Sequence, residues 1–188
     1  MDLVEEVVPL ADRELAVLRP RNSEALIDEH AFEEDELMPY WAELWPSGVA
    51  LAKAIAGRAL KGAAVLELGC GLGLPSLAAA RAGGRVLAVD WSAAAIELLE
   101  ANAERNGVVV EGLVATWTDP APLLARAPFR LVLAADVLYE QRNVPVLADL
   151  LPRLGGEVLL ADPGRPLLRG FLDEVGTVWE RPPVYRLR

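Results

Sequence analysis

The stretch VLELGCGLGLPS at residues 65–76 decides the fold of this protein. It joins a short apolar run to three glycines spaced two apart, which are Gly69, Gly71 and Gly73. A short apolar run closed by glycine is typical of a strand buried on both faces of a parallel sheet. Pro75 follows where proline commonly opens a helix. The stretch therefore predicts a strand, a glycine loop and a helix in succession.

Outward from this stretch, strand patterns recur along the rest of the chain. Including the first strand, they cover residues 63–69, 85–90, 108–116, 130–136 and 157–162, followed by 177–180 and 184–188. The last two are separated only by Arg181-Pro182-Pro183, which predicts a C-terminal hairpin. That hairpin is expected to place one antiparallel strand in the sheet.

Helical patterns fill the intervals between these strands. We expect helices from Ser47 to about residue 60, from Pro75 to the glycines at 83–84, and over residues 92–105, 143–154 and 166–175. Ser47, Ser92 and Asn143 are the expected N-caps. Strands alternating with helices predict right-handed crossovers. The fold class is thus α/β, a Rossmann-like, doubly wound and mostly parallel sheet of seven strands.

Composition limits the class of protein. The chain has 188 residues, is 53% hydrophobic and carries a net charge of -10. These values predict one globular domain, 1–188, in which an acidic N-terminal segment, 1–37, precedes the core. An acidic chain is a poor candidate for binding nucleic acid phosphates. The N-terminus lacks the basic residues of a signal peptide, and no run approaches the ~18 apolar residues of a membrane span. We expect a cytoplasmic monomer that binds neither nucleic acid nor membrane.

Cysteine and histidine are scarce. Cys70 and His30 are the single residues of their types, which excludes an intrachain disulfide and a cysteine-based metal site. We expect no metal. His30 stands between acids and is expected at the surface, not as a base. The acids at 33–36 are expected to form a solvated face, with docking of a basic substrate segment as the alternative.

The glycine spacing distinguishes between cofactors. A dinucleotide loop follows G-x-G-x-x-G, in which the pyrophosphate meets the helix N-terminus. Here the pattern is E-x-G-x-G-x-G from Glu67 onward, and Leu74 stands where the dinucleotide pattern requires glycine. S-adenosylmethionine has no phosphate, so the loop need only admit its methionine and ribose parts. The spacing favours S-adenosylmethionine.

Side chains at the ends of the second and third strands fit the remainder of that cofactor. Asp90 ends the second strand, 21 residues after Gly69, where a carboxylate can accept both ribose hydroxyls. Trp91 follows it and is a candidate wall for the adenine ring. Thr116 and Trp117 follow the third strand and form another candidate wall, because a planar aromatic ring gains stacking area at little entropic cost.

Four stretches carry a resemblance to a known family. They are PYWAELWPSG at 39–48, VLELGCGLG at 65–73, DVLYE at 136–140 and ADPGRP at 161–166. With them the chain resembles the seven-β-strand (class I) methyltransferases, and among these the protein lysine methyltransferase branch. The likeness is greatest to the enzymes that methylate the β subunit of electron transfer flavoprotein. It implies methyl transfer from S-adenosylmethionine to nitrogen, with a lysine-containing protein segment as the acceptor.

The resemblance also implies individual site residues. It implies cofactor contacts from Trp45, Glu67, Gly69, Gly71, Asp90, Trp91, Trp117 and the backbone near Ala135. Gly73 and Thr116 complete the expected cofactor set. Asp136 and Tyr139 are implied to face the transferred methyl group. The structural alternative makes Asp136 a loop cap and Tyr139 a core residue with its hydroxyl at the surface.

Other functions stay open on the sequence. One is a small-molecule N-methyltransferase. Another is a non-catalytic module that binds S-adenosylmethionine and uses the fold for protein contact; the intact loop, Asp90 and Asp136 argue against it. A third is a nucleotide-dependent oxidoreductase, which Leu74 disfavours.

Overall fold

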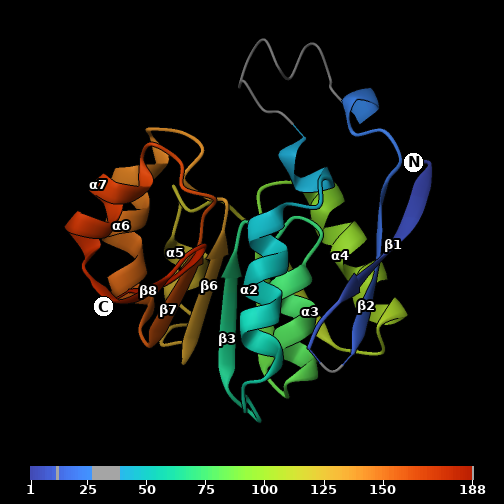
Figure 1. Cartoon of the computed structure of the whole chain (residues 1–188), viewed down its shortest axis with the longest axis horizontal. Helices are drawn as coiled ribbons and strands as arrows, with labels where there is room; N and C mark the ends of the chain where they lie inside the picture. Colours follow the sequence, from blue (N-terminus) through green and yellow to red (C-terminus); the bar gives the residue numbers. More distant parts are fainter. Residues whose placement is uncertain (12, 27–38, 188) are drawn as a thin grey trace.

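A computed structural model of the chain describes residues 1–11, 13–26 and 39–187 (Figure 1). Seven strands form the main sheet in the order β5-β4-β3-β6-β7-β9-β8. Their bounds are β3 Ala64–Leu68, β4 Arg85–Asp90, β5 Val110–Val114, β6 Leu131–Ala135, β7 Glu157–Ala161, β8 Thr177–Arg181 and β9 Val184–Leu187. The predicted strands all form, although the third is four residues shorter than the predicted 108–116.

The pairing of the strands confirms the predicted fold class. Strands β3 to β7 are parallel, whereas β9 runs antiparallel to both β7 and β8. The chain starts the sheet at β3, builds outward through β4 and β5, and then crosses to the other side of β3 to form β6. That reversal makes the end of β3 the topological switch point, where ligands bind in such sheets.

Helices cover both faces of the sheet. The helices are α2 Pro46–Ala56, α3 Leu74–Arg81, α4 Ala93–Arg105, α5 Ala121–Leu124, α6 Asn143–Leu154 and α7 Leu168–Val175, with short 3-10 turns η1 Glu24–Leu26 and η2 Tyr40–Ala42. Figure 1 shows α2, α3 and α4 on one face and α6 and α7 on the other. None of the helices in the described ranges is both long enough and apolar enough to cross a membrane.

The sheet has a hydrophobic core on each face, and successive side chains of a strand belong to different cores. Val65 of β3 packs with α2 and α3, whereas its neighbour Leu66 packs with the core beneath α6 and α7. This division follows from the period of two in a strand, which sends successive side chains to opposite faces. Leu147 and Leu151, four residues apart on α6, are buried in the second core.

An unpredicted hairpin occupies the N-terminal segment. Strands β1 Leu3–Pro9 and β2 Glu14–Pro20 pair antiparallel as a separate two-stranded sheet. The sequence analysis assigned no strand to this segment, and for these residues it was wrong. Leu15 and Val17 are fully buried and alternate with the less buried Glu14, Ala16 and Leu18, but the apolar Ala16 and Leu18 hide this alternation in the sequence. The hairpin packs on α3 and α4 and is not part of the main sheet.

Two of the three predicted helix caps are wrong. Ser92 accepts a hydrogen bond from the Ala95 amide at 3.4 Å and is the cap of α4. Ser47 lies inside the first turn of α2, because Pro46 opens that helix, and the helix ends at Ala56. Asn143 is the first residue of α6, and its side-chain amide donates to the Val137 carbonyl at 3.1 Å. The predictions for His30 and for the acids at 33–36 lie outside the described residues.

Candidate active site

A pocket opens at the carboxyl edge of the sheet, at the switch point beside β3. The segment before α2 and the loops after β3, β4, β5, β6 and β7 all contribute to its wall. Eleven of the twelve predicted site residues line it: Trp45, Glu67, Gly69, Gly71, Gly73, Asp90, Trp91, Trp117, Ala135, Asp136 and Tyr139. The chain thus brings the predicted cofactor and acceptor residues to one place.

Thr116 is the exception. It is exposed, and its hydroxyl lies 2.9 Å from that of Thr118 and 3.3 Å from the Asp119 amide. Thr116 lies in the segment that follows β5 and is not among the described residues that line the pocket, so its role as a cofactor contact stays a prediction. Its neighbour Trp117 does line the pocket.

The glycine loop is shaped by close approach of neighbouring segments. All three glycines have positive φ, a region that side-chain-bearing residues rarely adopt. A Cβ on Gly71 would lie 3.0 Å from the Trp41 carbonyl oxygen, and one on Gly73 would lie 2.1 Å from a methyl of Leu99. The positive φ favours glycine at both positions, and at Gly71 the backbone of Trp41 also leaves no room for a side chain. The loop can therefore run flat across the end of β3 and present backbone to a ligand.

Asp90 braces the glycine loop from the neighbouring strand. It is 5% exposed, and its two oxygens accept the Gly71 amide at 2.9 Å and the Ser92 amide at 3.0 Å. Burial raises the pKa of Asp90, while these amide donors oppose the rise. A carboxylate has about four acceptor positions. Asp90 can therefore hold the loop and still accept hydroxyl groups of a ligand.

Glu67 ties the end of β3 to the first turn of α3. Its carboxyl group is buried and accepts both the Ser76 amide, at 2.8 Å, and the Ser76 hydroxyl. Burial raises the pKa of Glu67 to about 8, with a further rise from the nearby charge of Asp90. Glu67 therefore holds a proton at neutral pH in the unliganded pocket. Its role in the fold is to fix the entry of α3 behind the glycine loop.

Tryptophans form much of the pocket wall. Trp91 is 37% exposed, an unusual position for the largest apolar side chain. Trp117 lies against the glycine loop, since a Cβ on Gly69 would be 3.2 Å from its ring. Trp45 stands at the start of α2, where its ring nitrogen donates to the Tyr40 carbonyl at 2.7 Å. These rings offer stacking surfaces for a planar ligand.

Asp136 adopts an unusual backbone conformation at the end of β6. Its φ is 58°, and it is the one non-glycine residue with positive φ in the described chain. Its amide donates to the Ala161 carbonyl at 2.9 Å, which ties the turn to β7. One carboxylate oxygen accepts from Arg165 at 2.9 Å, and the other is buried with no partner among the described residues. The side chain therefore caps no backbone group of its own loop.

Tyr139 stands at the mouth of the pocket. Its ring is 36% exposed and makes an edge contact with Tyr40, with 5.4 Å between ring centroids. Tyr40 in turn makes an edge contact with Trp45 at 6.1 Å. Burial raises the pKa of Tyr139, so its hydroxyl remains protonated at neutral pH. An exposed ring within an aromatic cluster argues against the alternative in which Tyr139 is a core residue.

Among the lining residues that were not predicted, two have side chains able to act on a ligand at the acceptor side. Tyr40 and Arg165 both line the pocket and both lie in stretches that carried the family resemblance. Tyr40 could have been found as an aromatic residue five positions before Trp45 in the stretch 39–48. Arg165 follows Asp162 by three residues at the carboxyl end of β7, the edge where the site was expected. Its partner Asp136 lies 29 residues away along the chain, so the pairing had no local signal.

Comparison with solved structures defines the class of the fold. The chain is similar to the 16S rRNA N2 methyltransferase RsmC of T. thermophilus, solved with AdoMet and guanosine, with a TM-score of 0.67 and 19% identity over 100% of this chain and 50% of that one. It is also similar to a tRNA uracil methyltransferase of Pyrococcus abyssi, solved with S-adenosyl-L-homocysteine, with a TM-score of 0.63 and 17% identity over 100% of this chain and 45% of that one. The fold is that of the class I methyltransferases.

The sequence defines the family. Residues 27–160, more than half of the chain, match the lysine methyltransferase family model, and the chain belongs to that family of methyltransferases. The electron transfer flavoprotein beta subunit lysine methyltransferase of Xenopus laevis is 34% identical over 139 residues, 68% of this chain and 53% of that protein. The Homo sapiens enzyme of the same name is 30% identical over 146 residues, 70% of this chain and 52% of that protein. The chain spans about half the length of these relatives.

Proposed function

We propose that this protein transfers the methyl group of S-adenosylmethionine to the side-chain nitrogen of a lysine in a protein. One observation carries the proposal. A glycine loop braced by Asp90 shares a pocket with Asp136, a buried carboxylate with one oxygen unpartnered among the described residues. Membership of the lysine methyltransferase family supports the same function.

The arrangement of the strands supports one orientation of the cofactor. Asp90 is the last residue of β4 and Asp136 follows β6, and these two strands flank β3 on opposite sides. In our proposal Asp90 accepts the ribose hydroxyls, Trp91 and Trp117 flank the adenine, and the loop backbone meets the methionine part. The methyl group then points toward the side of the pocket that Asp136 and Tyr139 line.

The pocket residues perform most of the catalysis by positioning. When bound, S-adenosylmethionine supplies an electrophilic methyl on a sulfonium, whose charge also disfavours a protonated amine nearby. A free lysine has a pKa of about 10.4, so the amine must lose a proton before attack. Asp136 binds and orients the amine and stabilises the positive charge that nitrogen gains in the transition state. The Tyr139 ring can present its face to the same charge.

The acceptor is proposed to be a basic protein segment. Two acids, Glu43 and Glu140, line the pocket in addition to Asp90 and Asp136. Acidic groups around a cleft attract a cationic partner and raise its rate of association. The relatives named above carry the electron transfer flavoprotein beta subunit in their names. For this chain, we limit the proposal to a lysine flanked by basic residues.

We also propose that the protein works as a monomer in the cytoplasm. One chain supplies the glycine loop, Asp90, Asp136 and Tyr139 to the same pocket. The single cysteine, Cys70, is buried and unpaired, which suits a reducing compartment.

The test begins with the cofactor. Titration calorimetry should show binding of S-adenosylmethionine and of S-adenosylhomocysteine, and Asp90→Ala should weaken it by about 1.5 to 3 kcal/mol through loss of a charged hydrogen bond. Asp149→Ala is the matched control, because Asp149 lies on α6 and its ion pair among the described residues is with exposed Arg153. Tight binding of NAD without any response to S-adenosylmethionine would overturn the proposal.

The acceptor is tested with cell extract. Extract incubated with the protein and radiolabelled S-adenosylmethionine should yield a labelled protein band, and hydrolysis of that band should release methyl-lysine. Label recovered only in small molecules would favour the alternative small-molecule N-methyltransferase. Cofactor binding with no transfer to any fraction would favour a non-catalytic module.

A further inference from the structure

Arg165 links two carboxylates at the acceptor side of the pocket. One terminal guanidinium nitrogen donates to Asp136 at 2.9 Å, and Nε lies 3.8 Å from Asp162 Oδ2. The guanidinium carbon is 5.9 Å from the centroid of the Trp45 ring. The backbone supports this placement, because the amide of Arg165 donates to Asp162 Oδ1 at 2.7 Å. Arg165 is therefore held at both its main chain and its side chain.

The contact with Asp136 leaves one carboxylate oxygen unused. Asp136 is 8% exposed, and its Oδ2 is buried with no hydrogen-bond partner in the described part of the chain. An unsatisfied buried acceptor is costly, so this oxygen has capacity for a donor from outside the chain. Arg165 occupies Oδ1 and thereby determines which oxygen of Asp136 is left for a ligand.

Asp136 by itself creates a difficulty for the chemistry. A lone carboxylate beside the acceptor amine stabilises the ammonium form, which cannot attack a methyl group. The guanidinium of Arg165 is always charged and acts on the amine with the opposite sign. With both groups present, the pair keeps a hydrogen-bond acceptor for the amine and loses much of its preference for the ammonium.

We propose that Arg165 is a positioning residue that orients Asp136 and, by its fixed charge, favours the neutral form of the acceptor amine. This inference rests on the proposed function, which places the transferred methyl beside Asp136. Arg165 makes no contact with the reacting atoms in this mechanism and acts through Asp136 and through its field. The residue thus sets the pH range in which the enzyme accepts its substrate.

Other charged or titratable groups line the same pocket or contact Arg165. They come from every element around the pocket and are Tyr40, Glu43, Glu67, Cys70, Asp90, Tyr139, Glu140 and Asp162. All of them except the tyrosines and the thiol are acids. Arg165 is therefore the one cation among the described residues that line the pocket. Arg142 also acts electrostatically on Tyr139, but it is paired with Glu140 and is not among the lining residues.

The test uses a probe that needs no catalysis. Sinefungin resembles S-adenosylmethionine but carries an amine on carbon in place of the methylated sulfonium, so its ammonium reports the field at the acceptor end. One charge within about 4 to 6 Å changes a pKa by at least about one unit, which is tenfold in affinity. At pH 7, Arg165→Gln should therefore bind sinefungin about tenfold more tightly relative to S-adenosylhomocysteine than the unmodified protein does.

Two variants separate charge from structure. Arg165→Lys keeps the positive charge and should restore most of the original affinity ratio. Arg153→Gln removes an exposed arginine on α6 that pairs with Asp149, and should leave the ratio unchanged. A loss of packing alone would weaken both ligands together and would leave the ratio constant, so thermal melting is measured beside each titration.

Activity provides the second readout. In the pH profile of kcat, the rising limb that reports deprotonation of the bound amine should move upward by about one unit in Arg165→Gln and return in Arg165→Lys. If the unmodified protein binds neither ligand, both the proposed function and this inference are refuted. If it binds both, and folded Arg165→Gln leaves the affinity ratio unchanged, only the role of Arg165 is refuted.

Discussion

Asp136 holds a conformation that few residues accept. A φ of 58° costs an L-residue other than glycine about 1 to 2 kcal/mol, and Asp and Asn tolerate it best. Such strain persists where the surrounding structure enforces it, and it is common at functional sites. Here the bonds from the Asp136 amide to Ala161 and from Arg165 to the carboxylate enforce it. The strain aims the side chain into the pocket instead of along the strand.

Loss of this carboxylate should separate chemistry from cofactor binding. Asp136→Ala should lower turnover by about 10² to 10³, the usual effect of removing one preorganised electrostatic group, and should leave the affinity for S-adenosylhomocysteine nearly unchanged. Tyr139→Phe should cost less, because the ring remains. Methyl transfer to the labelled protein is measured beside melting temperature and cofactor affinity.

The control for this variant is Asp136→Asn. Asparagine tolerates positive φ and keeps the shape, so Asp136→Asn should melt near the unmodified protein while losing activity as Asp136→Ala does. Full turnover in a folded Asp136→Asn protein would remove the charge from the mechanism. Lowered stability with normal turnover would instead give Asp136 a purely structural role through its ion pair with Arg165.

Glu67 makes stability depend on pH. Its pKa is raised from 4.5 to about 8 in the fold, so above pH 4.5 the unfolded chain releases a proton that the folded chain keeps. Stability is therefore fully present below about pH 4.5 and is lost as the pH rises toward 8. This loss amounts to up to about 5 kcal/mol of unfolding free energy, and the Glu67→Gln variant should not show it. Urea unfolding of the cofactor-free protein at pH 5 and pH 8 measures it.

The Glu67→Gln variant also defines the result that would contradict this prediction. The variant keeps an oxygen acceptor for Ser76 and differs mainly in having no ionisable group. If the unmodified protein and Glu67→Gln lose equal stability between pH 5 and pH 8, the ionisation of Glu67 does not contribute to the pH dependence.

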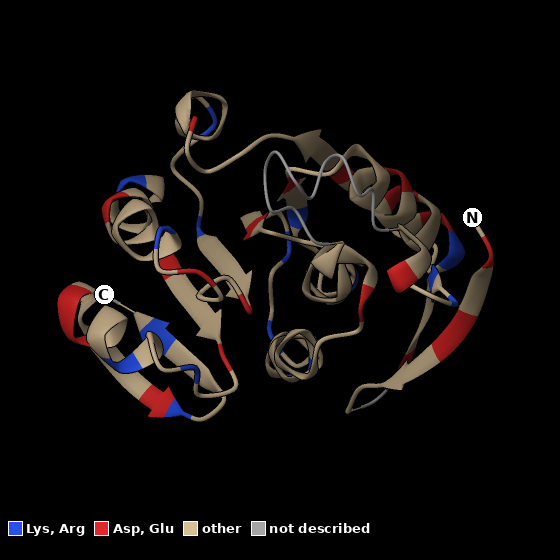
Figure 2. Cartoon of the chain, turned by 90° about the horizontal axis from the view of Figure 1, so that it is seen from above, with Lys and Arg blue, Asp and Glu red and all other residues tan. Residues whose placement is uncertain are grey.

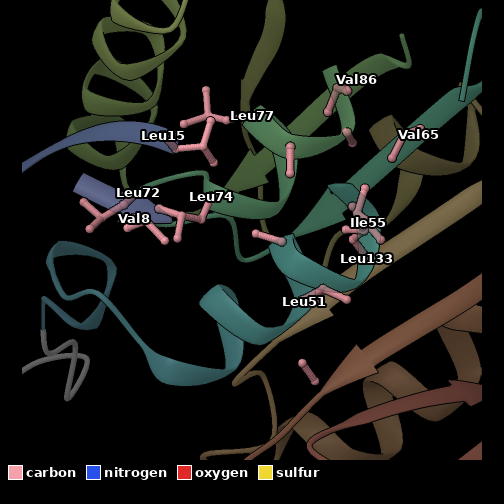
Figure 3. Packing of buried hydrophobic residues seen from close by; sticks show 14 of the residues in the cluster. Val8, Leu15, Leu51, Ile55, Val65, Leu72, Leu74, Leu77, Val86 and Leu133 are labelled. Carbon is pink, nitrogen blue, oxygen red and sulfur yellow. The ribbon is translucent and has the colours of Figure 1, made fainter. Parts of the chain in front are cut away.

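At the scale of elements, the N-terminal hairpin supports the cofactor loop. In Figure 3, Val8 and Leu15 of the hairpin lie beside Leu72, Leu74 and Leu77 of the loop and α3, and all belong to one buried cluster. Leu72 and Leu74 flank the last glycine of the loop. The hairpin therefore covers apolar side chains that would otherwise face water behind the ligand pocket.

Asn102 of α4 joins the hairpin to the loop by hydrogen bonds. Its oxygen accepts the Leu18 amide at 2.7 Å, and its amide group donates to the Leu18 carbonyl at 3.1 Å and to the Leu72 carbonyl at 3.2 Å. Asn106, one turn later, makes the same kind of paired contact with Ala16 but has no bond to the loop. The two asparagines form a matched pair for experiment.

Both asparagines should matter for stability, but only one for binding. Asn102→Ala and Asn106→Ala should each lower the unfolding free energy by about 1 to 3 kcal/mol, because each leaves backbone groups of β2 unpaired. Only Asn102→Ala releases the Leu72 carbonyl and should weaken S-adenosylhomocysteine binding several-fold beyond Asn106→Ala. Equal affinities in the two variants would show that the hairpin stabilises the fold without shaping the loop.

At the scale of the whole molecule, the sheet topology brings acidic residues from distant parts of the chain to the carboxyl edge of the main sheet. Figure 2 views the molecule from above, with short blue segments scattered among red ones. Acids outnumber bases by 28 to 18. Because β4 and β6 flank β3, residues far apart in the chain meet at the switch point. A cationic cofactor and a cationic acceptor would both enter a pocket with more negative than positive groups.

Local patterns were sufficient for the main sheet and for the glycine loop, whereas the acceptor residues Asp136 and Tyr139 were implied by the family resemblance. Apolar runs closed by glycine and by aspartate predicted the parallel strands, and the spacing of Gly69, Gly71 and Gly73 predicted the loop between β3 and α3. These features depend on residues close in sequence, where propensity and steric limits act directly. Since the carboxyl ends of parallel strands share one edge, the meeting of Asp90 and Asp136 in one pocket followed from the same patterns.

Only the tertiary structure decided the contacts between distant segments. The ion pair of Arg165 with Asp136 and the bonds of Asn102 to β2 join residues 29 and 84 apart, and no periodicity encodes such pairs. Helix caps failed for a related reason. Pro46 starts α2 one residue before Ser47, and packing then buries the serine hydroxyl where it finds no partner among the described residues. The sequence by itself determined the helices and strands of the main sheet and the edge of the sheet at which the pocket lies. Tertiary packing determined which side chains at that edge contact one another.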